Sequence, residues 1–510
     1  MKVSAVDGRA RGADLESLAR GGMLSLVGAA VSAVTGVGLV ALVTRGFSKA
    51  EAGVFFAATS LFLLGTAVAK LGAETGLVYF ISRLRVLDQR ARIRRMIAVA
   101  LTPVTVAAVL VGAALFWGAP WVADMAVDGP SGHFTNYLRT LACFLPLAAL
   151  TDTLLAATRG FRTQRPSALI ESIGRPLGQV ALVALVVVAG SASWLGLAWT
   201  LPYLPAAVLA GVWLHNLLPS RAHASAGEPL HDHDGVRREF WRYTWPRTFA
   251  GVAQLALQRL DIVLVAALRG PADAAIYTAA TRFLVVGQLG SRAISSAVQP
   301  QLGEQLALQD TAAARTLYRT ATAWLMLLAW PLYLLCATFA TPLMALFGEG
   351  YAAGTDVILV LTAAMLVATG CGMVDMLLSM SGRTSWNLVN ILLALAVNVG
   401  VDLVLIPRIG ILGAAIGWAA AIVFNNVVPL VQIGIILRLH PFGVATLTAG
   451  ALAALCFGVL PYAVRVTAGD GAVPLIASAL CGGALYLAGC WRFRRQLQLT
   501  SLRALRKERS

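Results

Sequence analysis

Stretches of about 20 predominantly apolar residues recur along this whole chain, and each is long enough to cross roughly 30 Å of hydrocarbon. A helix satisfies its backbone hydrogen bonds internally, so helices are what such runs form in lipid. The composition agrees, because 58% of the 510 residues are hydrophobic and only 13% are charged, against about 25% charged in soluble domains. The sequence predicts an all-α polytopic membrane protein.

These runs predict about fourteen transmembrane helices. The second run is expected to bend or to lie partly outside the hydrocarbon, because it contains Lys70 and Glu74. The third and sixth runs contain Pro103, Pro202 and Pro205, and proline bends a helix because it removes a backbone donor. The predicted spans are 21–44, 52–80, 96–118, 137–157, 168–189, 194–218, 243–268, 273–300, 320–347, 353–380, 385–406, 410–437, 442–464 and 472–491.

The loops between the runs are of two kinds. One kind, such as residues 83–95 and 159–165, is rich in arginine, whereas alternate loops such as 121–134 contain neither Lys nor Arg. Cytoplasmic loops carry the excess of basic residues, so both termini are predicted to be cytoplasmic. The first span has no convincing cleavage site and is expected to remain. The net charge of +16 indicates contact with anionic membrane lipids, and no nucleic acid is expected as a partner.

One segment of the first half recurs in the second. Residues 51–65 read EAGVFFAATSLFLLG, and residues 273–287 read DAAIYTAATRFLVVG. Spans one to six and seven to twelve are therefore expected to be parallel repeats, which leave a cleft suited to alternating access. The predicted domains are a cytoplasmic segment 1–20, a six-helix bundle 21–218, a cytoplasmic linker 219–242, a second six-helix bundle 243–438, helices thirteen and fourteen in 439–491, and a basic cytoplasmic tail 492–510.

Ionisable residues inside the predicted spans are functional candidates by default. Lys70 and Glu74 are four residues apart, as are Glu171 and Arg175, so each pair shares a helix face and is expected to form an ion pair. These residues either balance each other or serve a function.

Other charges have no partner on their own helix face. Arg139 and Asp152 lie thirteen residues apart in one span, so they need partners on other helices or water. Arg259 and Asp261 lie two residues apart, roughly 200° around a helix, and do not pair with each other. Each costs about 2.5–3.5 kcal/mol at a span centre. Their span is therefore expected to face protein or a water-filled cavity.

Arginines concentrate in the second half of the chain. Arg282 stands where the first repeat has Ser60, and a cavity rich in arginine selects anions, above all phosphate, which the guanidinium binds with two hydrogen bonds. Pairing of these arginines with Asp261, Asp152 or Glu74 remains the alternative. The cations proposed to bind substrate are Arg247, Arg259, Arg282 and Arg292. The residues proposed for charge balance or ion coupling are Asp261, Asp152, Glu74, Lys70 and Arg139.

Motifs for enzymatic or metal chemistry are weak. The six cysteines show neither a C-x-x-C sequence nor a Cys/His metal spacing. The HDHD stretch at 231–234 lies in the polar linker and is interpreted as a solvated loop. No Walker loop, G-x-S-x-G or H-E-x-x-H sequence occurs. No cofactor, metal or enzymatic activity is predicted, and energy would come from ions, membrane potential or the substrate gradient.

Three stretches of the second half resemble a known family: QRLDIVLVAALRGPADAAIYTAATRF, FGEGYAAGTDVILVLTAAMLV and NVGVDLVLIPRIGILGAAIGWAAA. They are similar to the polysaccharide transporter branch of the multidrug/oligosaccharidyl-lipid/polysaccharide (MOP) exporter superfamily. The resemblance implies a bacterial cytoplasmic-membrane flippase with a V-shaped central cavity. Its substrate would be an undecaprenyl-diphosphate-linked oligosaccharide, and a polysaccharide polymerase would be a partner.

Three other functions remain open. The lipid II flippase branch has the same fourteen-span plan, but its arginines concentrate in the first half. A cation-coupled multidrug antiporter of the superfamily usually has twelve spans and few cavity arginines. A membrane polysaccharide polymerase or ligase needs a large outer loop, and the longest one here offers only Asp124, Asp128 and His133.

Overall fold

The computed structural model describes residues 3–87, 89, 92–126, 132–218 and 233–499. All regular elements among these residues are helices, and thirteen helical stretches are long and apolar enough to cross a membrane. The all-α polytopic architecture predicted from the apolar runs is therefore confirmed. The chain divides into two compact units, Met1–Ala275 and Ile276–Ser510.

The predicted span at 273–300 is the one that is not among these thirteen. The chain forms a continuous helix there, α10 (Pro271–Ala307), which crosses the boundary between the two units. Its arginines and the polar residues of its second half reduce its hydropathy below that of the other spans. The remaining thirteen predicted spans each overlap a candidate span.

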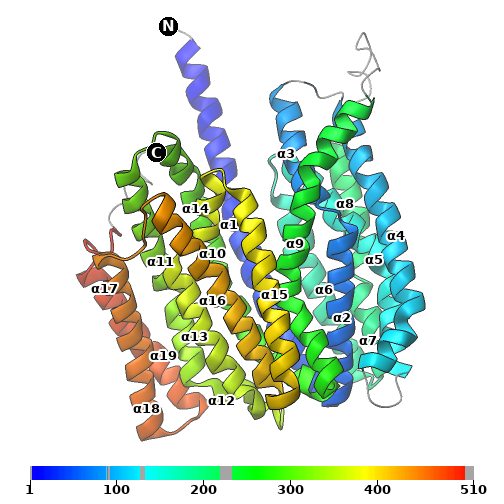
Figure 1. The fold of residues 1–510 in the computed structure, drawn as a ribbon, viewed down its shortest axis with the longest axis vertical. Coiled ribbons are helices and arrows are strands. Elements are labelled where there is room, and N and C mark those ends of the chain that lie inside the picture. The colour runs from blue at the N-terminus through cyan, green and yellow to red at the C-terminus, as the bar shows by residue number, and fades with distance from the viewer. Residues whose placement is uncertain (1–2, 88, 90–91, 127–131, 219–232, 500–510) are drawn as a thin grey trace. The chain divides into compact units, whose positions relative to one another are not determined.

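Among the described residues, the first unit contains ten α- and π-helical segments that precede α10 (Figure 1). α2 lies at the centre of this unit, where it contacts α4, α5 and α9. The segments are α1 (Val3–Gly46), α2 (Lys49–Ala69), α3 (Ala73–Val86), α4 (Ile93–Ala126), α5 (Gly132–Gly160), a π-helical segment (Ser167–Gly174), α6 (Arg175–Val188), α7 (Leu195–Thr200), α8 (Tyr203–Leu217) and α9 (His233–Arg269).

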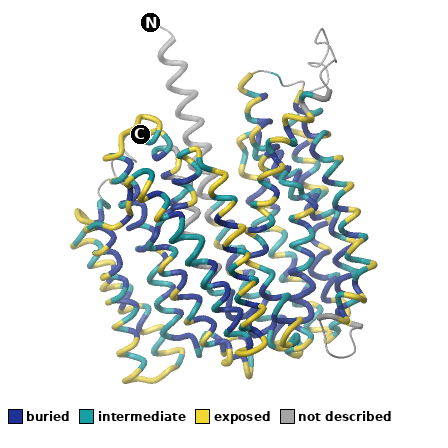
Figure 2. The backbone as a smooth tube through the Cα atoms, in the orientation of Figure 1, coloured by how far each residue is buried: buried dark blue, intermediate teal, exposed yellow. Residues whose placement is uncertain are grey.

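Burial differs strongly between these helices, as Figure 2 shows by colour. The apolar window of α2 is 67% buried, whereas that of α4 is 22% buried. Phe62 of α2 packs edge-on against Trp199 of α7 and Tyr203 of α8, with ring centroids 5.6 and 5.9 Å apart. The exposed apolar side chains of α4, such as Trp117 and Trp121, suit contact with lipid.

The second predicted span is broken rather than continuous. α2 ends at Ala69 and α3 begins at Ala73, and between them Leu71 and Gly72 take positive φ values of 49° and 66°. The bend expected from Lys70 and Glu74 is confirmed. Gly72 is required at its position, because an added Cβ would lie 2.9 Å from the carbonyl oxygen of Thr244 in α9.

The second unit continues from α10 and packs around α11. Tyr318 of α11 and Leu377 of α14 are fully buried in its core. Its further helices are α11 (Thr311–Thr338), α12 (Ala340–Ala345), α13 (Thr355–Cys371), α14 (Val374–Met380), α15 (Thr384–Ile409), α16 (Ile411–Ile436), α17 (Val444–Ala453), a π-helical segment (Ala454–Val459), α18 (Leu460–Ala468) and α19 (Ala472–Arg492).

Helices α15 and α16 approach each other closely through glycine. Gly413 and Gly417 of α16 are four residues apart, in the small-residue spacing that lets membrane helices approach. A Cβ at Gly413 would lie 2.5 Å from the backbone carbon of Leu405, and one at Gly417 would lie 1.9 Å from Oδ1 of Asp402. This crossing therefore tolerates no side chain at either glycine.

The C-terminal helices pack on α11. The Tyr486 hydroxyl of α19 donates a hydrogen bond to the carbonyl of Leu327 at 2.8 Å. After α19 the chain turns back, and Trp324 Nε1 donates to the carbonyl of Leu497, whose side chain is fully buried. Residues that follow the last span therefore form part of the core of the second unit.

The predicted domain boundaries remain predictions. The sequence predicts that residues 243–268 belong to the second bundle, whereas α9, which contains them, contacts α2, α3 and α4 and groups with the first unit. Most of the predicted linker, 219–232, lies outside the described residues, as does 500–510 of the predicted tail. The first two residues of the HDHD stretch also lie outside them.

Candidate functional site

A network of charged side chains lies at the break between α2 and α3. Lys70 Nζ is 3.1 Å from Oε1 of Glu74 and 3.1 Å from Oδ2 of Asp152 in α5. Lys70 follows the last residue of α2, and Glu74 lies in the first turn of α3. A cation at a helix C-terminus and an anion at a helix N-terminus both interact favourably with the helix dipole. The predicted Lys70–Glu74 pair is confirmed, and the break brings the two charges to α5.

Asp152 joins this network to α6. Its Oδ1 lies 3.5 Å from Nη1 of Arg175, and the Arg175 guanidinium stands over the ring of Tyr203, 4.9 Å from its centroid. The expectation that Asp152 finds partners on other helices is confirmed. Lys70, Asp152 and Arg175 have side chains that are 16–20% exposed, so the network is largely removed from solvent.

The predicted pair of Glu171 with Arg175 is wrong. Glu171 Oε2 instead lies 3.4 Å from Nη1 of Arg159, which also donates to the hydroxyl of Ser167. Glu171 lies in the π-helical segment Ser167–Gly174, where the turn is wider than in an α-helix. A spacing of four residues therefore no longer places the two side chains on one face.

Replacing Asp152 with asparagine should reduce the free energy of unfolding by about 2 kcal/mol. The change leaves Lys70 and Arg175 without their shared carboxylate, and removal of one partner from a buried pair costs about 3–5 kcal/mol, less here because the site is partly exposed. Chemical unfolding in detergent measures the loss. Glu239→Gln is the control, since the Arg83–Glu239 pair is about half exposed and should contribute less than about 1 kcal/mol. Equal losses in both variants would contradict the assignment.

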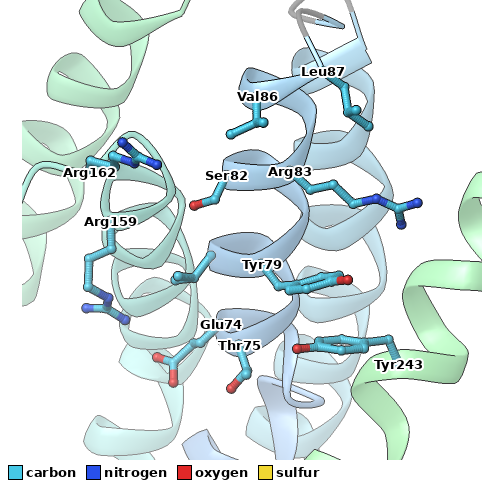
Figure 3. A pocket seen from close by; sticks show the side chains of 11 residues that line it. Glu74, Thr75, Tyr79, Ser82, Arg83, Val86, Leu87, Arg159, Arg162 and Tyr243 are labelled. Carbon is cyan, nitrogen blue, oxygen red and sulfur yellow. The ribbon is translucent and has the colours of Figure 1, made fainter. Parts of the chain in front are cut away.

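A groove of about 860 Å³ opens above this network in the first unit (Figure 3). α3 forms its floor, with Glu74 at one end and Leu87 at the other. Arg159 and Arg162 lie on one side of α3, and Tyr79 and Tyr243 lie on the other side. The groove therefore combines cationic and aromatic side chains from α3, α9, the end of α5 and the turn that follows it.

Tyr243 is held in a stack of three groups. Its ring lies 4.5 Å from the ring of Tyr79 at an interplanar angle of 17°, and the Arg247 guanidinium stands 3.7 Å from its centroid. Two groups this close cannot occupy the same face of a ring, so Arg247 and Tyr79 cover opposite faces. Arg247 also donates from Nη1 to the carbonyl of Tyr243 at 2.7 Å. The predicted cation Arg247 thus stabilises the aromatic side of the groove.

Arg259 is the predicted cation with the clearest need for a ligand. Among the described residues, its side chain forms no hydrogen bond or ion pair, although it lies partly buried within the span Arg237–Arg269. Twelve residues separate it from Arg247, which is about 18 Å along α9. A single diphosphate therefore cannot contact both arginines. Asp261 is buried, with 2% of its surface exposed, and has partners of its own.

Three other predicted candidates lie in α5 and α10. Arg282 belongs to the second unit and is not free of interactions, and Arg292 lies in α10 with its side chain outside the described residues. Arg139 of α5 stands 5.3 Å from the ring centroid of Phe116 in α4, away from Asp152. The four predicted cations therefore do not form one cluster within either unit.

The sequence prediction missed the residues around the groove. In the sequence, Arg159 and Arg162 indicate only a basic loop, and Tyr79 and Tyr243 carry no signal of a site. Arg159 lies seven residues after Asp152, on the same face of α5, and this spacing was the available signal. Nothing in the local sequence connects Tyr79 with Tyr243, because their contact depends on how α3 packs on α9.

Comparison with known proteins identifies the family. A family model described as "Polysaccharide biosynthesis protein" matches residues 42–353, which is more than half of the chain. The chain belongs to this polysaccharide biosynthesis protein family. No curated protein sequence matches it. The family membership agrees with the resemblance to polysaccharide transporters, and the family works in polysaccharide biosynthesis.

The fold of this polysaccharide biosynthesis protein is that of the MOP superfamily. It resembles the lipid II flippase MurJ in its inward closed conformation with a TM-score of 0.73 and 11% identity, over 93% of this chain and 99% of that one. It also resembles an inward-facing multidrug resistance MATE transporter (TM-score 0.64, 13% identity, 81% and 94% covered). A MOP-superfamily transporter from Pyrococcus furiosus gives 0.57, with 14% identity and 83% and 96% covered. The TM-scores establish a shared fold, while the sequence identities are low.

Proposed function

We propose that this protein moves an undecaprenyl-diphosphate-linked oligosaccharide from the inner to the outer leaflet of the bacterial cytoplasmic membrane. Both termini would be cytoplasmic, as the basic loops predict. The glycan would cross in a polar cavity while the polyprenyl tail stays in lipid, and the two helical bundles would alternate between inward and outward access. Family membership and the fold support a transporter in polysaccharide biosynthesis.

The observation that carries the proposal is Arg259. An arginine inside a span costs about 2.5–3.5 kcal/mol, and no acidic or hydrogen-bonding partner among the described residues offsets this cost for Arg259. A diphosphate supplies the missing charge, and its oxygens match the two parallel N–H donors of a guanidinium. A lipid-linked diphosphate therefore suits this position better than a cationic drug.

The experiment is a transfer assay with the full-length protein in proteoliposomes. Labelled polyprenyl-diphosphate oligosaccharides are added on one side, and an impermeant lectin or glycosidase counts those that reach the far leaflet. We expect protein-dependent transfer of surface-polysaccharide repeat units. Preferred transfer of lipid II would favour the lipid II flippase instead. Ion-driven efflux of a small cation without lipid transfer would favour the multidrug antiporter and overturn the proposal.

A further inference from the structure

The groove of Figure 3 has chemistry that the proposed function does not use. We propose that it is a second binding site for the substrate headgroup, which takes the diphosphate and its first sugar before transfer. This assignment rests on the proposed function, which supplies the substrate class. The groove is a separate position from Arg259, because sixteen residues, or about 24 Å of helix, separate Tyr243 from Arg259 in α9.

Arg162 gives the first argument, from its backbone. Its φ is +62°, in the left-handed region that suits glycine and costs other residues about 1–2 kcal/mol. The turn is tight, because the Arg162 N–H donates to the carbonyl of Arg159 at 2.9 Å. A position that only ended α5 would favour glycine. An arginine held here at a cost in backbone energy indicates that its side chain has a role.

The charge balance of the groove gives the second argument. Arg83 is paired with Glu239, Arg159 with Glu171, and Glu74 with Lys70. Arg162 is exposed, and its side chain forms no hydrogen bond or ion pair among the described residues. Counted over the described residues, the groove therefore has one uncompensated positive charge, in the turn that follows α5, and attracts an anion there.

The tyrosine side gives the third argument. Tyr79 is 44% exposed, and its stack with Tyr243 presents an apolar surface with two phenolic hydroxyls. Neither hydroxyl forms a hydrogen bond within the described parts of the chain. A sugar ring has an apolar C–H face and a rim of hydroxyl groups, so it matches an aromatic side chain with a polar end. A phosphate on Arg162 and a sugar on Tyr79 therefore fit opposite sides of one groove.

The test measures binding of a soluble headgroup to the full-length protein in nanodiscs. The probe is geranyl-diphosphate-linked N-acetylglucosamine, with geranyl diphosphate and free N-acetylglucosamine as partial probes. Arg162→Gly should weaken binding of the full probe about tenfold while leaving the unfolding midpoint unchanged or raised, because glycine suits the left-handed backbone. Tyr79→Ala should weaken the full probe several-fold but leave geranyl diphosphate unaffected. Arg165→Ala, an exposed arginine three residues further on, is the matched control.

Three outcomes would overturn the site. They are no binding of the probe to the wild-type protein, equal binding by Arg162→Gly and wild type, or a loss of binding in Arg162→Gly that is explained by a loss of stability.

The transfer assay separates this site from the proposed function. If the wild type transfers lipid-linked glycan and Arg162→Gly has the same half-saturating concentration, the groove assignment fails while the flippase stands. If the probe binds through Arg162 and no lipid-linked glycan is transferred, the flippase fails and the groove stands as an anion-binding site.

Discussion

Arg259→Glu should abolish transfer of lipid-linked oligosaccharide, with a loss of about 100-fold or more. A charge-assisted bidentate contact contributes about 3 kcal/mol, which corresponds to roughly two powers of ten in rate or affinity, and a carboxylate adds repulsion. Arg259→Lys keeps the charge but loses the paired donors, so we expect an intermediate loss of about tenfold. The measurement is the initial rate of transfer in proteoliposomes at matched protein content.

The stability of these variants separates a functional role from a structural one. Arg259 has no partner to lose among the described residues, so Arg259→Gln should unfold at the same denaturant concentration as the wild type, or a higher one. Arg408→Glu is the charge-reversal control, because Arg408 is exposed at the end of α15. Full transfer by Arg259→Glu, or an equal loss in Arg408→Glu, would remove Arg259 from the substrate path.

Gly413→Val should cost about 3 kcal/mol of stability or more. The Cβ would lie 2.5 Å from the backbone carbon and 2.7 Å from the carbonyl oxygen of Leu405, and backbone atoms cannot rotate away as a side chain does. Helix α16 would have to move from α15, with loss of the close packing on which membrane helices depend. Chemical unfolding in detergent or mild bicelles measures the effect.

Gly434→Val provides the matched control in the same helix. No atom lies within 4 Å of a Cβ built at Gly434, and valine forms helix more readily than glycine. This variant should therefore be as stable as the wild type or slightly more stable. Equal destabilisation by both substitutions would show that glycine in α16 matters for flexibility rather than for the close approach to Leu405.

The sequence predicted the architecture well because hydropathy is a property of single segments. Thirteen of the fourteen spans and the break at Lys70 follow from composition within each segment. α10 was the exception, since its repeat of the α2 sequence suggested a span although its second half is polar. The pairing of α9 with α2 and α3 could not be predicted, because it depends on contacts between distant segments.

The site was harder to predict, for the same physical reason. Lys70 and Glu74 lie four residues apart, so local spacing revealed their pair. Glu171 and Arg175 also lie four apart, but the π-helical segment changes the turn and redirects Glu171 to Arg159. The groove of Tyr79, Tyr243 and Arg162 brings together α3, α9 and the turn after α5, and no spacing rule connects them.

The turn-back of the chain after α19 has a consequence for the order in which the protein is made. α11 leaves the ribosome long before Leu497, yet Trp324 of α11 uses the Leu497 carbonyl as its hydrogen-bond acceptor. During synthesis this part of α11 stays uncovered until residues beyond the final span have emerged. The first unit has no such dependence, because all its helices through α9 precede Ala275. Nascent chains stalled near residue 300 should therefore already protect the first unit from protease, whereas protection of the second unit should appear only after Leu497 has emerged.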